Sequence, residues 1–316
     1  MTMRAVVIRE FGGPEVLTPT EVEVPEPGPG QVRIRVVAAA TNPVEAKIRQ
    51  GVAMPDLPLP AILGGDVSGV VDAVGPGVAD PAVGDEVYCT PELTARQAGY
   101  AEYCVVSASI AAPKPRSLGH REAAAIPLAG GTAWEAIVRR LAVRPGETVL
   151  VQGGSGGVGT FAVQFAVAAG GRVLATAGPK NQDLLSELGA VAIDYHRDDP
   201  AQVTRDETGG HGADAVLDLV GGENLATSCR AARDFGRIAT VLPPSGELPD
   251  LYQRNQVLHG IMLTRERARL DEMTPVFERG QARPVVTGVL PLDRVRESHE
   301  QLDSGHGRGK TVLEVG

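Results

Sequence analysis

The first 120 residues contain short runs of apolar and β-branched residues, separated by Pro-Gly, Gly-Gly and Gly-Asp pairs. Short runs of this kind, with turn residues between them, predict strands. The predicted strands are Arg4–Ile8, Val16–Val24, Gln31–Ala38, Val67–Val74, Asp85–Cys89 and Tyr100–Val106. One helix, Pro43–Gln50, is expected among them, because proline suits the first turn of a helix. This part of the chain is therefore predicted to be rich in β-structure.

After about Pro115 the pattern changes to strands and helices in alternation. The predicted strands are Glu147–Gln152, Arg172–Ala177, Val191–Tyr195, Ala213–Leu219 and Gly236–Leu242. The predicted helices are Gly131–Leu141, a helix that ends at Ala169, Asn181–Leu188, Pro200–Glu207 and Asn224–Arg233. Short strands joined by single helices predict an α/β fold with a doubly wound parallel sheet.

The tail is expected to contain two more helices and two more strands. They are helix Arg265–Arg279, strand Val285–Leu290, helix Asp293–Asp303 and strand Thr311–Val315. Elements that follow a complete doubly wound unit often return to the first domain. We therefore expect a discontinuous β-rich domain made of residues 1–120 and 265–316, and a doubly wound domain of residues 121–264.

Charge and composition exclude several classes of protein. The net charge is −9 and no run of lysine or arginine occurs, so nucleic-acid and membrane-surface partners are not expected. Three cysteines cannot all pair with one another, which indicates a reducing compartment, and they lack the CxxC spacing of a zinc knuckle or redox motif. No apolar run reaches the length of a membrane span, and the first residues lack the apolar core of a signal peptide. A cytoplasmic location is expected.

The strongest local motif is the glycine-rich stretch 153–159, in which Gly154, Gly156 and Gly159 match GxGxxG. It follows an apolar strand and opens an apolar helix, as a dinucleotide-binding turn does. The first N–H groups of such a helix can bind phosphate. The predicted binding residues are Gly154, Ser155, Gly156, Gly157, Val158 and Gly159. The alternative is a glycine turn with a purely structural role.

The end of the next strand indicates which cofactor binds. An NAD site usually carries an acidic residue there to bind the ribose 2′-hydroxyl, but residues 175–180 contain no acid. Lys180 stands there instead and could bind a 2′-phosphate, and Tyr195 ends the third strand and could add a hydroxyl. NADPH is therefore the predicted cofactor. The alternatives are a solvated lysine at Lys180 and a sheet-edge aromatic at Tyr195.

Six segments together resemble a known family. They are Ala40–Arg49, Gly64–Val71, Val83–Tyr88, Gly130–Trp134, the glycine turn and Gly305–Lys310, and they span nearly the whole chain. The chain resembles the zinc-independent, quinone oxidoreductase-like branch of the medium-chain dehydrogenase/reductase superfamily. The resemblance implies a GroES-like catalytic domain and a Rossmann domain. Relatives are commonly dimers built through the edge of the Rossmann sheet, so a homodimer is expected by analogy.

The sequence departs from zinc-dependent relatives at the positions of their catalytic metal. Those relatives carry cysteine where Asn42 stands, and a His-Glu pair where Gly65 and Asp66 stand. The short stretch between Cys89 and Cys104 has no counterpart of their four-cysteine lobe. The six histidines also lack metal-ligand spacing. No metal site is predicted.

Without a Lewis acid to stabilise an alkoxide, the expected substrates are acceptors that delocalise the charge of an incoming hydride. Quinones and α,β-unsaturated carbonyls do so. Asn42 is the first catalytic candidate, because its amide could bond the cofactor ribose or the substrate carbonyl; the alternative is a cap for the helix at Pro43. Lys47 stands where many relatives have tyrosine and could act on an enolate oxygen; the alternative is a solvated lysine.

The resemblance also implies further cofactor-binding positions. Thr132 and the pair Val241 and Leu242 match family positions near the nicotinamide, and Arg308 and Lys310 lie in the tail motif. Thr132 and Glu135 equally have the spacing of a helix capping box. For Arg308 and Lys310 the alternative is exposure to solvent.

Three functions remain open from the sequence. The first is an NADPH-dependent reductase of quinones, and the second is an NADPH-dependent enone or enoyl reductase acting on a C=C bond. Both take a small-molecule substrate. The third is a protein that binds NADPH as a sensor or structural partner with little turnover.

Overall fold

The computed structural model describes residues 1–92, 97–305 and 307–316, which form two compact units. Unit 1 contains Met1–Ala129, Thr264–Glu278 and Pro284–Gly316, and unit 2 contains Gly130–Leu263 and Arg279–Arg283. Each unit has its own sheets and its own core. His306, which belongs to the tail motif, lies outside the described residues.

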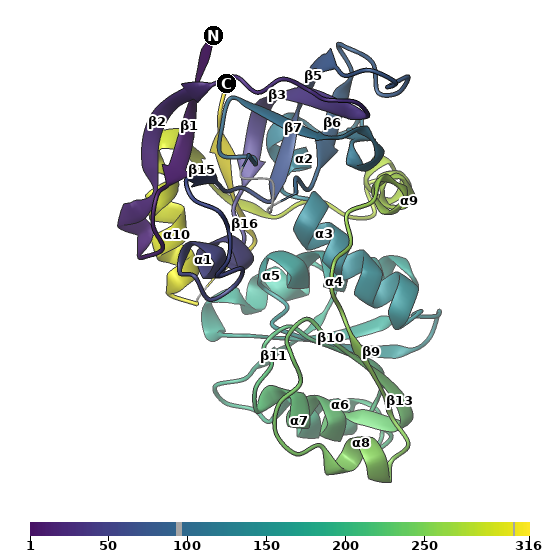
Figure 1. Cartoon of the computed structure of the whole chain (residues 1–316). Helices are drawn as coiled ribbons and strands as arrows, with labels where there is room; N and C mark the ends of the chain where they lie inside the picture. Colours follow the sequence, from purple (N-terminus) through teal and green to yellow (C-terminus); the bar gives the residue numbers. More distant parts are fainter. Residues whose placement is uncertain (93–96, 306) are drawn as a thin grey trace. The chain divides into compact units, whose positions relative to one another are not determined.

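Unit 1 is built mainly of antiparallel strands (Figure 1). They are β1 (Thr2–Ile8), β2 (Thr18–Glu23), β3 (Gln31–Ala40), β4 (Ala61–Ile62), β5 (Asp66–Val74), β6 (Glu86–Cys89), β7 (Tyr103–Ser107), β8 (Ala112–Pro113), β15 (Val286–Pro291) and β16 (Lys310–Glu314). One sheet has the order β2-β1-β4, and the larger has the order β15-β16-β3-β5-β6-β8 with β7 also paired to β3. Strand β16 pairs with β3, placing Val312 opposite Ala40.

Unit 1 also contains helices that pack against these sheets. They are α1 (Pro43–Arg49), α2 (His120–Ala124), α9 (Arg267–Glu278), α10 (Val295–Asp303) and the short η1 (Pro14–Val16), η3 (Ala108–Ile110) and η6 (Leu292–Arg294). Alternate residues of β3 are buried, as the period of a strand with one core face requires. Ile34, Ile48 and Val295 are fully buried in one apolar cluster, so β3, α1 and α10 share a core.

Unit 2 contains the predicted parallel sheet. Its strands are β9 (Thr148–Gln152), β10 (Arg172–Ala177), β11 (Val191–Asp194), β12 (Ala213–Asp218), β13 (Ala232–Thr240) and β14 (Val257–Gly260). They pair in the order β11-β10-β9-β12-β13-β14, which is the Rossmann order. The fold class expected from the sequence is confirmed. Strand β14 was not predicted, because Val257–Gly260 is short and includes a histidine and a glycine rather than an apolar run.

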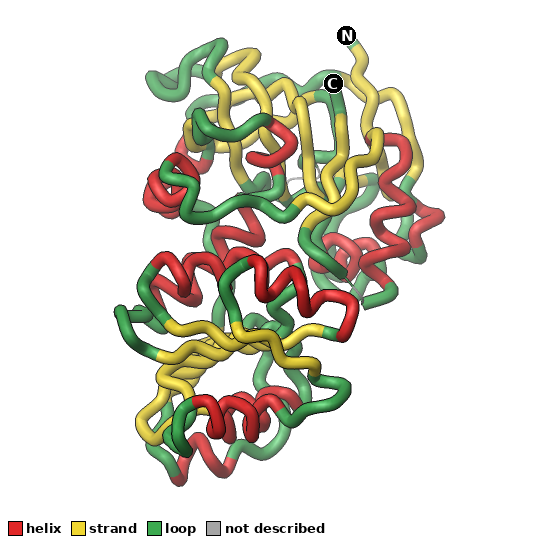
Figure 2. The backbone as a smooth tube through the Cα atoms, turned by 180° about the vertical axis from the view of Figure 1, so that it is seen from behind, coloured by secondary structure: helices red, strands yellow, loops and turns green. Residues whose placement is uncertain are grey.

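Helices cover both faces of this sheet, and Figure 2 shows its strands between two helical layers. They are α4 (Gly157–Ala168), α5 (Gln182–Glu187), α6 (Pro200–Glu207), α7 (Asn224–Ala231), α8 (Pro249–Gln253) and the short η5 (Pro179–Asn181). Leu150, Val216 and Ile238 from three neighbouring strands are fully buried beneath these layers. The carboxyl ends of β9 and β12 lie side by side, where the strand order reverses and ligands bind in such sheets.

One predicted helix begins earlier than expected. The helix predicted over Gly131–Leu141 starts as α3 (Pro127–Trp134) and continues as the π-helical segment η4 (Glu135–Arg140). Pro127 occupies the first turn, as proline does at helix starts. Thr132 therefore lies inside the helix, and the capping box from Thr132 to Glu135 is wrong. The Glu135 carboxylate instead accepts a hydrogen bond from Arg140 Nε at 2.8 Å.

No helix in the part of the chain that the structure describes combines the length and the apolar character that crossing a bilayer requires.

Candidate functional site

The glycine turn of unit 2 connects β9 to α4. Gly153 follows the strand directly with φ of +79°, a left-handed conformation that glycine adopts at little cost. Gly156 is the N-cap residue, and α4 begins at Gly157. The residue with the left-handed backbone is thus Gly153, one position before the first glycine of the GxGxxG motif.

The three positions of the motif require glycine for different reasons. A Cβ on Gly154 would lie 2.8 Å from the Ala175 Cβ, and a Cβ on Gly159 would lie 2.2 Å from the Gly153 carbonyl oxygen. Both glycines are therefore required by packing. A Cβ on Gly156 would meet no atom closer than the Gly153 oxygen at 3.6 Å. The fold does not need glycine at Gly156, whereas a phosphate approaching the backbone there would.

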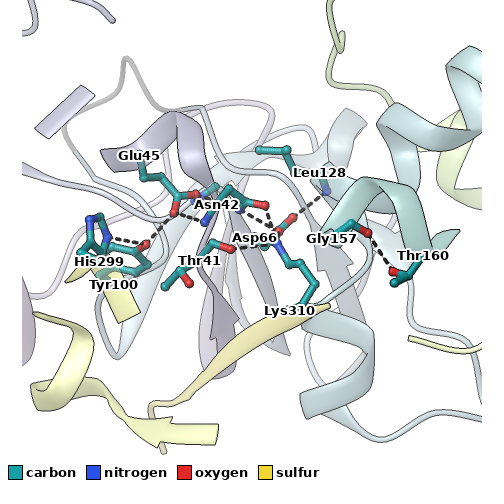
Figure 3. A network of polar contacts seen from close by, with 11 residues as sticks. Thr41, Asn42, Glu45, Asp66, Tyr100, Leu128, Gly157, Thr160, His299 and Lys310 are labelled. Atoms are coloured by element: carbon teal, nitrogen blue, oxygen red, sulfur yellow. Dashed lines mark hydrogen bonds and ion pairs between the residues drawn. The ribbon is translucent and has the colours of Figure 1, made fainter. Parts of the chain in front are cut away.

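The start of α4 supplies donors to that open space. The first N–H groups of a helix have no intrahelical partner, which applies to Gly157, Val158 and Gly159. The Thr160 hydroxyl donates to the Gly157 carbonyl at 3.1 Å (Figure 3). Ser155 is buried, and its hydroxyl accepts a hydrogen bond from Asn181 Nδ2 at 3.3 Å. The arrangement fits a dinucleotide pyrophosphate, and Asn181 is a neighbour that the motif did not predict.

Exposed side chains surround the carboxyl end of β10. Lys180 is exposed in η5, three residues after the strand. The Tyr195 ring stacks on His196 with centroids 4.5 Å apart. A Cβ on Gly178 would lie 3.5 Å from His196 Nε2 and 3.8 Å from Tyr195 Oη, so both rings lie over the strand end. The structure thus brings Tyr195 to the strand end that Lys180 follows, and adds His196, which sequence reasoning missed.

The other predicted cofactor positions of unit 2 lie on separate elements. Val241 and Leu242 follow β13 directly and are half-buried. Leu242 packs against Gly221, because its Cδ1 atom lies 2.6 Å from the position of a Cβ on that glycine. Thr132 is nearly buried on α3. These positions remain predictions.

Unit 1 contains a buried polar cluster, which we call the Asn42 cluster (Figure 3). It consists of Asn42, Glu45, Asp66, Tyr100, His299 and Lys310, each of which is at most 4% exposed. Lys310 was expected either at the cofactor or in solvent, and its burial rules out exposure. Its Nζ donates to Asp66 Oδ2 at 3.0 Å, to the Thr41 carbonyl at 3.0 Å and to Asn42 Oδ1.

Two carboxylates and one ammonium hold the Asn42 amide in one orientation. Its Nδ2 donates to Glu45 Oε1 and to Asp66 Oδ2, both at 3.0 Å, while Oδ1 accepts from Lys310. The flipped amide would place its oxygen against two carboxylates and its NH2 against an ammonium, so this orientation is assigned by electrostatics. Both amide hydrogens are used. Among the contacts between described residues, Oδ1 accepts one hydrogen bond and has a second lone pair available, which suits accepting a hydroxyl hydrogen better than donating to a substrate oxygen.

Glu45 connects this amide to the start of α1. Its carboxylate accepts four hydrogen bonds, from Asn42 N at 2.8 Å, Asn42 Nδ2 at 3.0 Å, Gly65 N at 2.6 Å and Tyr100 Oη at 2.6 Å. Asn42 is the N-cap residue of α1, but the side chain that binds the cap backbone is that of Glu45. Burial raises the pKa of Glu45, and the bonds from Tyr100 and Asn42 oppose that rise.

Asp66 is the second buried carboxylate. Its Oδ1 accepts from the Leu128 N–H at 2.6 Å, and its Oδ2 accepts from Lys310 and Asn42. Burial raises the pKa of Asp66, whereas the Lys310 ammonium lowers it. A buried ion pair is retained at low cost only when further hydrogen bonds satisfy its remaining atoms, as these bonds do.

Two predicted residues of unit 1 lie apart from the Asn42 cluster. Lys47 is exposed on α1, and its ammonium forms no hydrogen bond or ion pair with another described residue. Arg308 is exposed just before β16, and its carbonyl accepts from the Thr287 hydroxyl at 2.6 Å. The roles of both residues remain predictions.

Comparison with known proteins decides the family. Residues 28–116 match the family described as alcohol dehydrogenase GroES-like domain, and residues 188–313 match the family described as zinc-binding dehydrogenase. The quinone oxidoreductase of Rattus norvegicus is 32% identical over 98% of this chain and 97% of its own length. The chain belongs to the quinone oxidoreductase-like branch of the medium-chain dehydrogenases/reductases.

Two further members of the superfamily are similar over nearly the whole chain. The chloroplastic NADPH-dependent alkenal/one oxidoreductase of Arabidopsis thaliana is 35% identical over 98% of this chain and 79% of its own length. A crystal structure described as an NAD-dependent alcohol dehydrogenase is 41% identical, with a TM-score of 0.94, and covers 99% of this chain and 100% of its own.

The description "zinc-binding dehydrogenase" implies a metal, and the residues of this family member do not fit one. The Lys310 ammonium is hydrogen-bonded to the side chains of Asn42 and Asp66, so a divalent cation at those atoms would face a positive charge. A Cβ on Gly65 would lie 2.6 Å from Glu45 Oε1, so a ligand side chain there would displace the Glu45 carboxylate from its hydrogen bonds. The described residues contain no group of three or more His, Cys, Asp or Glu side chains that could hold a metal.

Sequence reasoning found Asn42 and Lys310 but missed most of their partners. Glu45 carried a usable signal, because Asn-x-x-Glu before an apolar helix has capping-box spacing. Asp66 lies in the segment Gly64–Val71 that carried the family resemblance, but no partner for it was predicted from the sequence. Tyr100 and His299 carried no local signal, since they are separated by 199 positions in the sequence and meet only in the fold.

Proposed function

We propose that this protein is an NADPH-dependent reductase that transfers a hydride to quinones without a metal. The observation that carries the proposal is the Lys310 ammonium bonded to Asn42 and Asp66, at positions where zinc-dependent relatives carry their metal site. A site without a Lewis acid favours acceptors that delocalise the developing negative charge themselves. The likeness to the rat quinone oxidoreductase supports the same acceptor class.

The residues of the chain bind and orient the reactants. NADPH, when bound, supplies the hydride from its nicotinamide ring. Gly154–Gly159 would hold the pyrophosphate through backbone N–H groups at the start of α4, and Lys180 and Tyr195 would hold the 2′-phosphate. Asn42 would accept a ribose hydroxyl hydrogen at Oδ1 and so help to orient the cofactor. Thr132, Val241 and Leu242 would contact the nicotinamide, and Arg308 would add a positive charge to the cofactor site.

Lys47 is the proposed catalytic cation. It stands where many relatives carry tyrosine, and its ammonium is not engaged elsewhere among the described residues. An ammonium beside the acceptor stabilises the oxyanion of a hydroquinone or an enolate and can return a proton to it.

Reduction of a C=C bond in enones is the second candidate. It is favoured by the likeness to the Arabidopsis alkenal/one oxidoreductase, which covers 98% of this chain. Both reactions need the same cofactor and the same freedom from a metal. A protein that binds NADPH with little turnover is the third candidate.

Product analysis separates the three candidates. The purified protein is given NADPH with a panel of quinones and, separately, with a panel of enones, and loss of the reduced nicotinamide absorbance is followed. Hydroquinone as the product, with little enone turnover, supports the proposal. Saturated ketone from enones establishes the second candidate. Binding of NADPH without turnover of either panel establishes the third.

The proposed cofactor preference is tested at Lys180. A charge-assisted hydrogen bond to phosphate contributes about 1.5–3 kcal/mol, so Lys180→Ala should raise KM for NADPH about tenfold or more. KM for NADH should change little, because NADH has no 2′-phosphate. This comparison matters because one similar crystal structure is described as NAD-dependent.

The matched control is Arg144→Ala. Arg144 is an exposed cation that precedes β9, at the opposite edge of the sheet from the carboxyl ends. This variant should keep the wild-type KM for both cofactors. An equal rise for NADPH and NADH in Lys180→Ala would contradict the assignment of Lys180 to the 2′-phosphate.

We further propose a cytoplasmic homodimer that pairs through the edge of the unit 2 sheet. Strand β14 is last in the strand order, and Val257 on it is 47% exposed. A second copy of the strand would bind the open hydrogen-bonding edge. Sedimentation equilibrium should give twice the chain mass, and a monomer mass would contradict the homodimer. Recovery of the native protein in a membrane fraction would contradict the location.

A further inference from the structure

A chain of hydrogen bonds leads from Arg49 to Glu45 through the core of unit 1. Arg49 Nη1 lies 3.4 Å from His299 Nδ1. His299 Nε2 lies 3.1 Å from Tyr100 Oη, and Tyr100 Oη lies 2.6 Å from Glu45 Oε2 (Figure 3). A guanidinium can only donate, so His299 Nδ1 accepts. The proton of His299 is then on Nε2 and points to Tyr100, which in turn donates to Glu45. Every bond in the chain is directed toward Glu45.

This chain orients groups but does not conduct protons to solvent. Its outer member, Arg49, is fully buried and paired with Asp303 at 2.6 Å, and arginine does not release its proton in proteins. Burial, helped by the Arg49 charge, lowers the pKa of His299 to about 3, so the ring is neutral at ordinary pH. The chain therefore has a fixed polarity that ends on the Glu45 carboxylate.

We propose that Tyr100 is a positioning residue for the reaction: its hydroxyl fixes the Glu45 carboxylate, and Glu45 fixes the Asn42 amide with Oδ1 toward Lys310. Of the four hydrogen bonds that Glu45 accepts, two come from Asn42, through its backbone N–H and its Nδ2. A carboxylate held by Tyr100 thus determines which atom of Asn42 remains free. The inference rests on the proposed function in one respect, the role of Asn42 at the cofactor.

Loss of the Tyr100 hydroxyl should change the protonation of Glu45. The charged and titratable groups around Glu45 are Asp66, Lys310, Tyr100, His299 and Arg49. The Tyr100 bond lowers the pKa of Glu45, so its loss raises that pKa. As the pH falls, Glu45 would then take up a proton at a higher pH than in the wild type. A protonated Glu45 cannot accept all four bonds, and the hold on Asn42 is weakened.

The test compares Tyr100→Phe with Tyr88→Phe. Tyr88 is also fully buried in unit 1, and its hydroxyl donates to the Leu270 carbonyl at 3.0 Å, away from Glu45. Each substitution removes one buried hydroxyl, so similar losses of thermal stability are expected. The readouts are the pH profile of kcat/KM and the pH dependence of the NADPH dissociation constant, measured by fluorescence titration.

In Tyr100→Phe, kcat/KM relative to the wild type should fall about tenfold at the acidic end of the profile but less than about threefold at the alkaline end. NADPH should bind more weakly than in the wild type at the lower pH only. Tyr88→Phe should follow the wild-type profile. If Tyr100→Phe does not fold, His299→Asn replaces it: asparagine can keep the contact with Arg49 but does not reach Tyr100. Its profile should shift in the same direction by a smaller amount.

Superimposable profiles of Tyr100→Phe and Tyr88→Phe, or a loss that is equal at every pH, would overturn the inference. Failure of the proposed function looks different, because the wild type itself would then turn over neither acceptor panel. In that case the NADPH titration decides: a pH-dependent loss of affinity in Tyr100→Phe alone supports the positioning role, and unchanged affinity overturns it.

Discussion

At the scale of single residues, the site of unit 1 is decided by a balance of buried charges. Two carboxylates, Glu45 and Asp66, share the core with one ammonium, Lys310, and hydrogen bonds satisfy the remaining atoms. Sequence reasoning singled out Asn42 and Lys310, because both stood in motif positions. It could not tell that they touch, since 268 positions separate them.

Removal of Lys310 should therefore be costly. Lys310→Met leaves Asp66 and Asn42 Oδ1 buried without their cation, and breaking a buried pair in this way costs about 3–5 kcal/mol. Denaturant unfolding measures the change. The control is Arg121→Met, which removes an exposed ion pair to Glu314 and should cost less than about 1 kcal/mol. Equal losses in the two variants would show that the cluster contributes no more than a surface pair.

His299 should impose a pH dependence on stability. Its pKa in the folded protein is about 3, below the ordinary value for histidine, so the unfolded chain binds a proton that the folded chain excludes. Between about pH 6 and pH 4, this histidine should lower the free energy of unfolding by about 1.4 kcal/mol for each unit of falling pH. His299→Asn should lose this part of the slope, measured by denaturant unfolding. His211→Asn, at an exposed histidine, should keep the wild-type slope.

At the scale of elements, alternating strands and helices made unit 2 predictable. The exceptions have local causes. Helix α3 begins at Pro127, because proline takes a first helical turn and Asp66 binds the Leu128 N–H. Strand β14 escaped prediction because Val257–Gly260 is short and contains a histidine and a glycine instead of an apolar run. The other edge strand, β11, has a stronger apolar pattern and was predicted.

Two glycine substitutions in the turn should distinguish an effect on folding from an effect on NADPH binding. Gly159→Ala would place a Cβ 2.2 Å from the Gly153 oxygen, so it should lower the melting temperature and impair NADPH binding. Gly156→Ala has open space around its Cβ and should keep the wild-type melting temperature while weakening NADPH binding about tenfold or more. Calorimetry with and without NADPH measures both effects. Unchanged NADPH affinity in Gly156→Ala would contradict the proposal that this turn binds the pyrophosphate.

At the scale of the whole molecule, this chain has the fold of its superfamily, and in unit 1 the Lys310 ammonium is bonded to Asn42 and Asp66. The parallel sheet and the antiparallel domain could be predicted from the sequence, because repeated patterns and family motifs specify them. The contacts that determine chemistry could not, because Asn42, Tyr100, His299 and Lys310 come from four distant segments.

Activity should therefore survive removal of metal ions. Prolonged dialysis against EDTA should leave the rate of NADPH oxidation unchanged, because no step assigned to the chain uses a divalent cation. Metal analysis of the dialysed protein provides the control. Loss of activity that added zinc restores would show that Asn42, Gly65 and Asp66 had been misinterpreted.

The crowding of Gly65 by the Glu45 carboxylate also constrains how this lineage can change. Histidine at position 65 would collide with Glu45, and cysteine at position 42 would leave Glu45, Asp66 and Lys310 without the amide that joins them. Each single substitution toward a zinc site should therefore destabilise the Asn42 cluster unless the others are already present. Neighbouring substitutions of this kind are strongly non-additive. A zinc site at these positions would therefore require several coordinated replacements and could not be built by single mutations.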